Sequence, residues 1–393
     1  MARLAMISAI SVLLAASACT VQPGGGTQLD GGVDDTEVAV DSGTGGATPP
    51  KNALNFAPTN APNVVADGTS NIQISGNCTF DTTAGTANCL YDSDYRFQKI
   101  TQTDVDQTEI GVFVMGSLIV GPNATITVTG SRPLVLVTSG AMTIKGMMTA
   151  MPGVETNRSN GGGYSAPLAG ATDHKGRGPG GGGAPTGTNG GGGGAYCGKG
   201  GGTNGGTPYG SAEISPLDGG SSGGMGFDLA GGGGGAIQLV SSTSITLTSQ
   251  AKINVGGGGG VLYGDGGGSG GAVLLEAPVV TMGGTIAANG GSGSSNSNGT
   301  SGSSGTADST PAPGGLGNNA GGSGSAGTTI DGTTGTYNDS SVTMIGIGNY
   351  GGGSGGGAGR IRINTTTGQA TITGTLSPAS TTTCVSQGKL KVS

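Results

Sequence analysis

Short runs in which apolar residues alternate with small or polar ones recur along the chain from residue 111 onward. Four of these runs open alike, as GVFVM at 111–115, GAIQL at 235–239, GAVLL at 271–275 and GRIRI at 359–363. Each is followed by two further short runs within roughly 20 residues. Alternation with a period of two is typical of strands that bury one face. The pattern therefore predicts an all-β chain of many short strands.

Three short strands within roughly 20 residues match one turn of a parallel β-helix. Turns of this kind stack at about 4.8 Å, so the inward Ile, Val, Leu and Met side chains form one continuous core. We therefore expect a right-handed parallel β-helix, or β-solenoid, over residues 111–393. Residues 51–110 hold more aromatic and charged residues, and 71–75 (NIQIS) alternate as a strand should, which predicts an N-terminal β cap.

Long glycine-rich segments interrupt the pattern at about 153–235, 256–270 and 289–358, always after the third run of a copy. Insertions at one corner of a solenoid project from one face. Glycine loses much entropy on ordering, so these inserts should be mobile unless they pack as extended strands of polyproline II type. The sequence leaves both alternatives open. Because loop length costs little, we also expect that residues 289–358 can be deleted without unfolding the strands.

Residues 1–18 have the features of a signal peptide: a positive Arg3, an apolar stretch at 4–14 and the small residues ASA at 16–18. Residues 13–19 (LLAASAC) resemble the lipobox of bacterial lipoproteins, in which the cysteine is acylated and becomes the mature N-terminus. The resemblance implies that Cys19 carries fatty acids such as palmitate. The lipid bilayer would then be a partner, and the protein would lie on the cell surface at the outer membrane.

Ala16 stands where lipoboxes usually have leucine, so ordinary cleavage followed by secretion is the alternative. Residues 19–50 are mostly Gly, Asp, Thr and Pro and contain almost no apolar clusters. This composition predicts a disordered linker between the anchor and the folded part.

The cysteine count agrees with an acylated Cys19, because the chain has five cysteines and acylation leaves four to pair. Cys78 and Cys89 bracket a threonine-rich stretch with a glycine that could turn as a hairpin, so they are expected to form a local disulfide. Cys197 and Cys384 would form the second disulfide by elimination, although nothing local brings them together.

Charge and composition exclude several classes of protein. The net charge is −7 and the Lys and Arg residues are scattered, so no basic stripe could neutralise nucleic-acid phosphates. Charged residues make up 9% of the chain, against a typical value of about 25%. The 91 glycines follow no strict Gly-x-y repeat, which excludes collagen. We expect neither a nucleic-acid partner nor a cofactor.

Candidate catalytic groups are sparse. His174 is the only histidine and lies in a glycine-rich insert, where we expect it to be solvated and poorly placed for general-base catalysis. The recurring runs contain the charged residues Lys145, Lys252, Glu276, Arg360 and Arg362. Paired carboxylates for glycoside hydrolysis are therefore not available from them. Asp265 faintly resembles a calcium-binding β-roll position but has no tandem copy. We predict no catalytic residue and no metal site.

Aromatic residues are the most distinctive side chains of the inserts, which hold Tyr164, Tyr196, Tyr209, Phe227, Tyr263, Tyr337 and Tyr350. These rings could contact a sugar or a surface, and we take Tyr337 and Tyr350 as the candidate ligand-contact residues. Alternatively, each ring fixes its own loop against glycine backbone or against the strands. The sequence does not decide between the two.

The segments GGAI at 234–237, GGAV at 270–273 and GGGAGRIRI at 355–363 resemble the repeat starts of bacterial β-helical adhesins and autotransporter passengers. With the lipobox, the whole chain is similar to glycine-rich lipoproteins of unassigned function that are common in myxobacterial-type genomes. The resemblance implies a structural or adhesive role in the cell envelope, without catalysis, with envelope or extracellular polysaccharide as a candidate partner. A carbohydrate-active β-helix enzyme and a passive, low-complexity coat protein are the alternatives.

Overall fold

The computed structural model describes residues 54–103, 108–152, 158–168, 171–296, 300–338 and 350–392. The predicted signal peptide at 1–18, Cys19 and the predicted linker at 19–50 lie outside the described residues.

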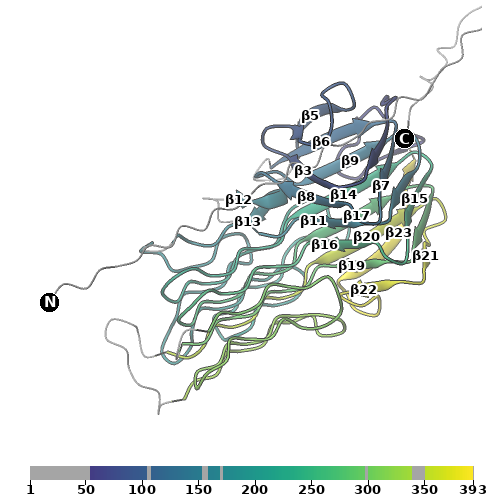
Figure 1. Cartoon of the computed structure of the whole chain (residues 1–393). Helices are drawn as coiled ribbons and strands as arrows, with labels where there is room; N and C mark the ends of the chain where they lie inside the picture. The colour runs from purple at the N-terminus through teal and green to yellow at the C-terminus, as the bar shows by residue number, and fades with distance from the viewer. Residues whose placement is uncertain are drawn as a thin grey trace, which may run out of the picture. The chain divides into compact units, whose positions relative to one another are not determined.

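Three main sheets hold most of the strands (Figure 1). Sheet 1 consists, in spatial order, of β2 (Asn71–Ile74), β7 (Ser117–Val120), β10 (Met142–Ile144), β15 (Ser244–Leu247), β18 (Val279–Met282) and β21 (Thr371–Ile372). Sheet 2 consists of β22 (Thr375–Ser377), β19 (Thr285–Ala287), β16 (Lys252–Asn254), β11 (Met147–Thr149), β8 (Thr125–Thr129), β3 (Asn77–Asp81) and β4 (Thr86–Ala87). Sheet 3 consists of β23 (Val385–Lys389), β20 (Arg360–Thr365), β17 (Ala272–Glu276), β14 (Ala236–Ser241), β9 (Leu134–Thr138), β6 (Glu109–Met115) and β5 (Arg96–Thr101).

Two small antiparallel pairs complete the regular structure. Strand β1 (Phe56–Ala57) pairs with β24 (Lys391–Val392), which joins the two ends of the described part. Strand β12 (Arg158–Ser159) pairs with β13 (Gly163–Tyr164) around the short 3-10 turn Asn160–Gly162. This turn is the only helical element in the described residues, so the expectation of a β-rich chain is met.

The predicted right-handed parallel β-helix, or β-solenoid, is wrong. The sheets are open and mixed: β4 and β5 run antiparallel to their neighbours β3 and β6, and the sheets do not close on one another. After β11, β16 and β19 the chain leaves the sheets and returns only at β14, β17 and β20. The reason is that the intervening residues are not loops at a corner but form a packed body of their own, described below.

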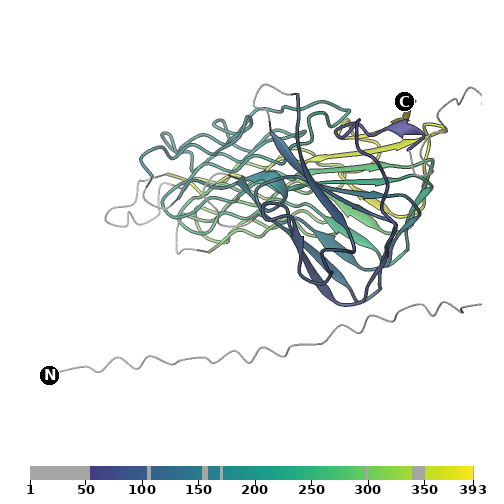
Figure 2. The ribbon, with the colours of Figure 1, turned by 90° about the horizontal axis from the view of Figure 1, so that it is seen from above.

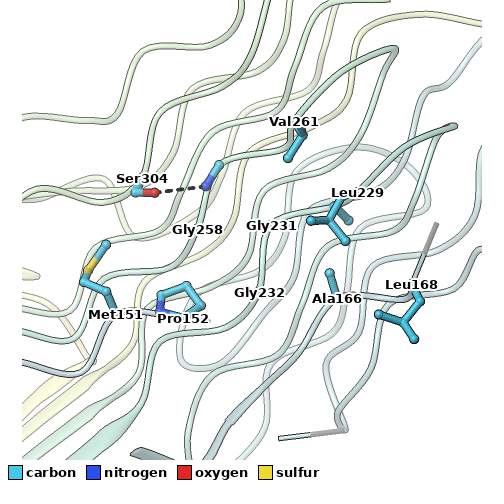
Figure 3. Close-up of a pocket in the computed structure, with 12 residues that line it drawn as sticks. Met151, Pro152, Ala166, Leu168, Leu229, Gly231, Gly232, Gly258, Val261 and Ser304 are labelled. Atoms are coloured by element: carbon cyan, nitrogen blue, oxygen red, sulfur yellow. Dashed lines mark hydrogen bonds between the residues drawn. The ribbon is translucent and has the colours of Figure 1, made fainter. Parts of the chain in front are cut away.

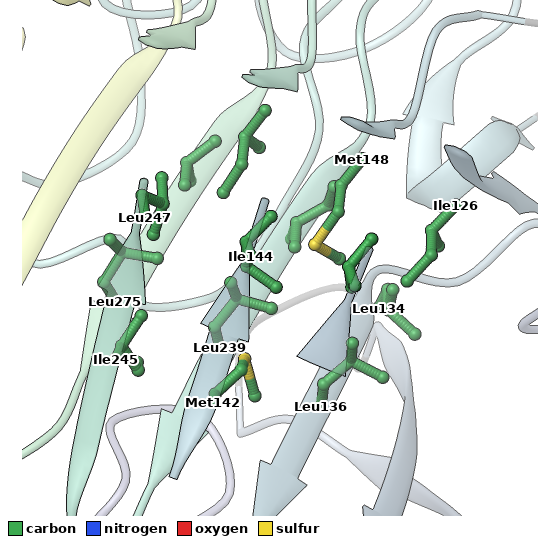
Figure 4. Packing of buried hydrophobic residues seen from close by; sticks show 14 of the residues in the cluster. Ile126, Leu134, Leu136, Met142, Ile144, Met148, Leu239, Ile245, Leu247 and Leu275 are labelled. Atoms are coloured by element: carbon green, nitrogen blue, oxygen red, sulfur yellow. The ribbon is translucent and has the colours of Figure 1, made fainter. Parts of the chain in front are cut away.

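An apolar core lies between the three sheets (Figure 4). Met142 and Ile245 are partners on adjacent strands of sheet 1, and Leu136 and Leu239 are partners in sheet 3. All four side chains are fully buried. Burying one such side chain contributes about 1.5–3 kcal/mol. The apolar residues of the alternating pattern are therefore the ones whose burial holds the sheets together.

The central strands β6, β9, β14 and β17 of sheet 3 are buried on both faces, and the outer face packs against the N-terminal residues 54–66. Glu276 of β17 is buried there and accepts four hydrogen bonds. Its donors are the Thr59 N–H (3.0 Å), the Thr59 hydroxyl (2.6 Å), the Gln238 amide (2.6 Å) and the Asn364 amide (3.0 Å). This carboxylate therefore joins the N-terminal segment to the sheet.

The glycine-rich segments lie together on one side of the sheets (Figures 1 and 2). We call them the glycine body, which comprises the described residues of 160–235, 256–271, 288–338 and 350–359. Its segments are joined mainly by hydrogen bonds from backbone to backbone. The sequence left open whether the inserts are mobile or packed as extended segments, and in the structure they are packed.

The bonding pattern within the glycine body has a period of three residues. Gly191 donates its N–H to the carbonyl of Gly264, and three residues later Gly194 donates to Gly267. Between them, Gly192 donates to a different segment, at Gly183. A β-strand has a period of two, whereas a polyproline II helix has three residues per turn and no internal hydrogen bonds. The segments are therefore of polyproline II type, each bonded to several neighbours.

Glycine is required in this body because neighbouring backbones lie too close to admit a Cβ atom. A Cβ atom on Gly193 would lie 1.8 Å from the Gly355 carbonyl oxygen, and one on Gly355 would lie 1.9 Å from the Ser323 carbonyl oxygen. Both obstacles are backbone atoms held by their own hydrogen bonds, so they cannot move aside. Such close approach of a Cα to a carbonyl is the geometry of weak Cα–H···O contacts.

The hydrogen bonds of residues 289–358 argue against the expectation that this segment can be deleted without unfolding the strands. Gly257 donates to the carbonyl of Asn289, and Gly270 donates to that of Gly357. Deleting the segment would leave such buried N–H groups without acceptors, at a cost of about 1–3 kcal/mol each.

The first prediction tests the close packing of the glycine body. Gly355→Ala should lower the free energy of unfolding by about 1–3 kcal/mol, because the added methyl overlaps a backbone oxygen. Gly76→Ala is the matched control: no atom lies within 4 Å of the added Cβ position, and its effect should stay within about 0.5 kcal/mol. Denaturant unfolding followed by circular dichroism measures both variants. Equal effects would contradict the close packing.

Candidate functional site

One buried carboxylate holds two turns of the glycine body together. Asp265 is fully buried. One of its oxygens accepts the N–H groups of Gly226 (2.7 Å) and Phe227 (3.2 Å), and the other accepts those of Leu229 and Leu262 (both 3.0 Å). Burial raises the pKa of the Asp265 carboxyl, while these N–H groups act in the opposite direction. The carboxylate is thus occupied by backbone donors, and it fixes the course of both turns.

An apolar pocket of about 220 Å³ opens beside these turns (Figure 3). It is lined by Met151, Pro152, Ala166, Leu168, Leu229, Ala230, Gly231, Gly232, Gly258, Gly259, Val261 and Ser304. None of these residues is charged, and Ser304 supplies the one side-chain hydroxyl. Two glycine segments in the lining are joined by a hydrogen bond from the Gly258 N–H to the Gly232 carbonyl (2.8 Å). The pocket can therefore receive an apolar group but offers no acid or base.

Two aromatic rings extend from the same turns. Phe227 and Tyr263 meet edge to face, with ring centroids 5.7 Å apart and ring planes at 88°. The Phe227 side chain is 49% exposed. Both residues are among the aromatic residues of the glycine-rich inserts. The neighbouring sequence does not distinguish them from the others, because Asp265 accepts the N–H groups of Gly226 and Phe227 across 39 and 38 residues of chain.

The two candidate ligand-contact residues, Tyr337 and Tyr350, are both half-buried. The Tyr350 ring covers the backbone of Gly264, where an added Cβ atom would lie 2.9 Å from the ring. Burial raises the pKa of Tyr350 to about 12. Asn319 accepts the Asn338 N–H (2.6 Å) and donates to the Tyr350 carbonyl (3.4 Å), so the backbone near the two tyrosines is brought together. The Tyr350 ring therefore packs against the backbone of Gly264, and its role as a ligand contact stays a prediction.

A second polar cluster surrounds the β12–β13 hairpin. Arg158 forms an ion pair with Asp218, lies 4.1 Å above the Tyr164 ring and donates a 2.7 Å hydrogen bond to the Tyr164 hydroxyl. That hydroxyl donates to Asp218 at 3.1 Å. Burial raises the pKa of the Asp218 carboxyl, and the guanidinium of Arg158 counteracts the rise. The three side chains bond to one another and none lines the pocket, so we interpret the cluster as structural.

His174 is only partly exposed, and it contacts backbone in addition to solvent. It is half-buried, and its Nδ1 lies 3.1 Å from the carbonyl oxygen of Met225 and 3.2 Å from that of Gly226. The ring therefore contacts the backbone next to the first Asp265-bound turn.

The structure pairs Cys78 with Cys89 and Cys197 with Cys384, at Cα–Cα distances of 5.2 and 5.6 Å. These are the pairs suggested by the sequence, and the second joins the glycine body to the C-terminal residues. Among the described residues, no group of three or more His, Cys, Asp or Glu side chains is arranged to hold a metal ion. Nor does any helix in that part of the chain have the length and apolar character needed to cross a membrane.

No family model matches the chain, and no curated protein or solved structure matches it.

The second prediction concerns Asp265. Asp265→Asn replaces one acceptor oxygen by an amide that would face two N–H donors, so the free energy of unfolding should fall by about 1–3 kcal/mol. Asp331→Asn is the control, because Asp331 is exposed and accepts one backbone bond, from Lys199 at 2.8 Å. Urea unfolding compares the two variants. A loss in Asp265→Asn no greater than in the control would show that the carboxylate does not hold the turns.

Proposed function

We propose that the protein is a structural or adhesive component of the cell envelope, without catalytic activity, attached to the outer membrane through an acylated Cys19. The observation that carries the proposal is the exposed Phe227 ring, which a buried carboxylate holds in place on a body built from close-packed backbone. Such a body is suited to hold exposed side chains in fixed positions on its surface, where a partner can contact them.

The fixed position of Phe227 favours binding. Its backbone N–H is bonded to Asp265, and its ring contacts Tyr263, so little freedom remains to be lost when the ring contacts a ligand. Aromatic rings supply large apolar contact area and pack well against flat, weakly charged surfaces such as sugar rings. Envelope or extracellular polysaccharide is therefore the partner we propose.

The use of the buried acids favours a structural or adhesive role over a carbohydrate-active enzyme. Asp265 accepts backbone N–H groups, Glu276 joins the N-terminal segment to sheet 3, and Asp218 is paired with Arg158. Acid–base cleavage of a glycosidic bond needs two carboxyl groups facing a common space. These three are instead bound in separate structural roles.

The third prediction tests adhesion. Phe227→Ala should weaken binding to insoluble envelope polysaccharide about 2- to 10-fold, since one aromatic contact is worth about 0.5–1.5 kcal/mol beyond its buried area. Tyr91→Ala is the control, because Tyr91 is 67% exposed but lies outside the glycine body. A pull-down with purified protein measures both. Unchanged binding in a folded Phe227→Ala variant would refute a contact through this ring. A wild-type protein that does not bind would favour the passive coat, and release of reducing or unsaturated sugars would favour the enzyme.

The fourth prediction tests the anchor. Cells that make the wild-type protein should incorporate a labelled fatty acid into it and retain it, whereas Cys19→Ser should remain unlabelled and appear in the medium. Retention needs more than one acyl chain, because a single chain gives only marginal membrane binding. Metabolic labelling and fractionation measure both properties. A wild-type protein that is unlabelled and secreted would refute acylation and leave ordinary cleavage as the export route.

A further inference from the structure

Positive charge is concentrated in the last part of the sequence. Residues 340–393 contain four cationic side chains, Arg360, Arg362, Lys389 and Lys391, and no acidic one. The whole chain has 15 cationic and 22 acidic residues, which leaves 11 cationic and 22 acidic residues, a net charge of −11, for residues 1–339. An anionic partner is therefore attracted by the C-terminal part and repelled by the rest.

Three of these cations lie together at one corner of sheet 3. Strand β23 is the edge strand of this sheet and pairs with β20. The Arg362 guanidinium of β20 lies beside Gly388 of β23, where an added Cβ atom would be 2.3 Å from its Nη2. Lys389 follows directly, and Lys391 begins β24. We call Arg362, Lys389 and Lys391 the basic corner. Arg360 lies further along β20, where it is bonded to backbone carbonyls.

No acidic side chain of the described residues forms an ion pair with the basic corner. The Arg362 guanidinium donates to three uncharged acceptors, the Asn364 side-chain oxygen (2.9 Å), the Ser386 hydroxyl (3.1 Å) and the Ala212 carbonyl (3.2 Å). Glu213 follows Ala212 in the sequence, and the buried Glu276 accepts its bond from Asn364 rather than from the guanidinium. Both lysines of the corner are exposed, so their charges are available to an external partner.

The fold holds the basic corner in a fixed position. Lys391 of β24 is paired with Ala57 of β1, and Lys389 of β23 is paired with Thr365 of β20. The disulfide between Cys197 and Cys384 directly precedes β23. Val392, next to Lys391, is 89% exposed. An apolar side chain beside cations is suited to enter the headgroup layer of a bilayer.

The glycine body lies at the other end of the strands of sheet 3. It joins this sheet directly before β14, β17 and β20 begin, whereas Lys389 is opposite Thr365, the last residue of β20. The C-terminus and most of the glycine body accordingly lie at different ends of the described part (Figures 1 and 2). A surface that binds the basic corner would thus leave the glycine body facing away from it.

The course of the chain selects a membrane as the anionic partner. The first strand, β1, lies at this same corner, where Phe56 pairs with Val392. Cys19 precedes Phe56 by 37 residues, and a flexible linker of this length spans roughly 30–36 Å. We infer that the basic corner contacts the anionic headgroups of the membrane to which the acylated Cys19 is attached. The choice of a membrane rests on the proposed anchor, whereas the contact itself needs no acyl chain.

Such a contact would complement the acyl anchor. A single acyl chain gives only marginal attachment, and a polybasic patch can supply the second signal that stable attachment needs. Each Lys or Arg close to an anionic membrane strengthens binding about 5-fold. The attraction falls off over a Debye length of about 8 Å at physiological ionic strength, so only residues at the contact contribute. The body would therefore be oriented as well as retained.

The test uses the full mature chain with Cys19→Ser, so that no acyl chain contributes. It should co-sediment with vesicles made of phosphatidylglycerol and phosphatidylcholine in equal parts but not with phosphatidylcholine alone, and added salt should weaken the binding. Lys389→Gln combined with Lys391→Gln should weaken it at least about 10-fold. The matched control, Lys145→Gln combined with Lys252→Gln, removes two exposed lysines next to β10 and in β16 and should change binding less than about 2-fold.

A variant that keeps the charge, Lys389→Arg combined with Lys391→Arg, should bind as the wild type does, and circular dichroism verifies that each variant is folded. Equal binding to neutral and anionic vesicles would overturn the inference, as would an equal loss in the two glutamine variants. So would binding to an acidic polysaccharide such as alginate without binding to vesicles, because the polysaccharide would then be the partner. Absent vesicle binding together with normal labelling of Cys19 would refute this contact and leave the proposed anchor intact.

Discussion

Hydrogen bonding between glycine backbones that approach too closely for a Cβ atom is the interaction on which the glycine body depends. Ordering glycine costs more entropy than ordering any other residue. The cost is offset because each inner segment is bonded to several neighbours, so that most of its backbone groups are paired with other backbone groups and a few with buried Ser or Asp side chains. A body of this kind needs few charged or apolar residues, which accounts for 91 glycines in a chain with 9% charged residues.

The same constraint explains how the glycine body is connected to the sheets. Gly235 donates to the carbonyl of Ala150, and Gly271 donates to that of Val255, just before β14 and β17 begin. At these points the backbone changes from a period of three to a period of two. The recurring Gly-Gly-Ala motif therefore marks the position where a close-packed glycine segment ends and a strand begins. Its two glycines belong to the packed segment, and its alanine is the first residue of β14 and β17.

The sequence predicted local features well because their cause is local. Alternation over 235–239 predicted β14, and the buried residues of the core are the apolar residues of that pattern. The arrangement of the sheets could not be predicted in the same way. A run of glycines has no side-chain pattern, so the sequence could not show whether it forms loops at the corner of a solenoid or a body that interrupts the sheets. Its bonding partners are chosen by tertiary packing.

The sequence does not single out the candidate site, for a related reason. Near Asp265 it shows only a faint calcium-binding pattern, because the N–H groups that the carboxylate accepts lie up to 39 residues away. Tyr337 and Tyr350 stand out in the sequence only as aromatic residues of an insert, and in the structure Tyr350 covers Gly264. The exposed ring of Phe227 has no distinguishing neighbour in the sequence. The pair Cys197 and Cys384 could be suggested only by elimination, because 187 residues separate them.

The position of functional side chains follows from the physics of the glycine body. Most inner positions are glycine, and an inner side chain such as that of Asp265 is bound to backbone N–H groups. Exposed apolar side chains stand where a segment turns and meets solvent, as at Phe227, and there the backbone is held by hydrogen bonds on the inside. Substitutions at such turns can change the exposed surface without disturbing the packing beneath. The surface can therefore vary at the turns while the requirement for glycine inside remains strict.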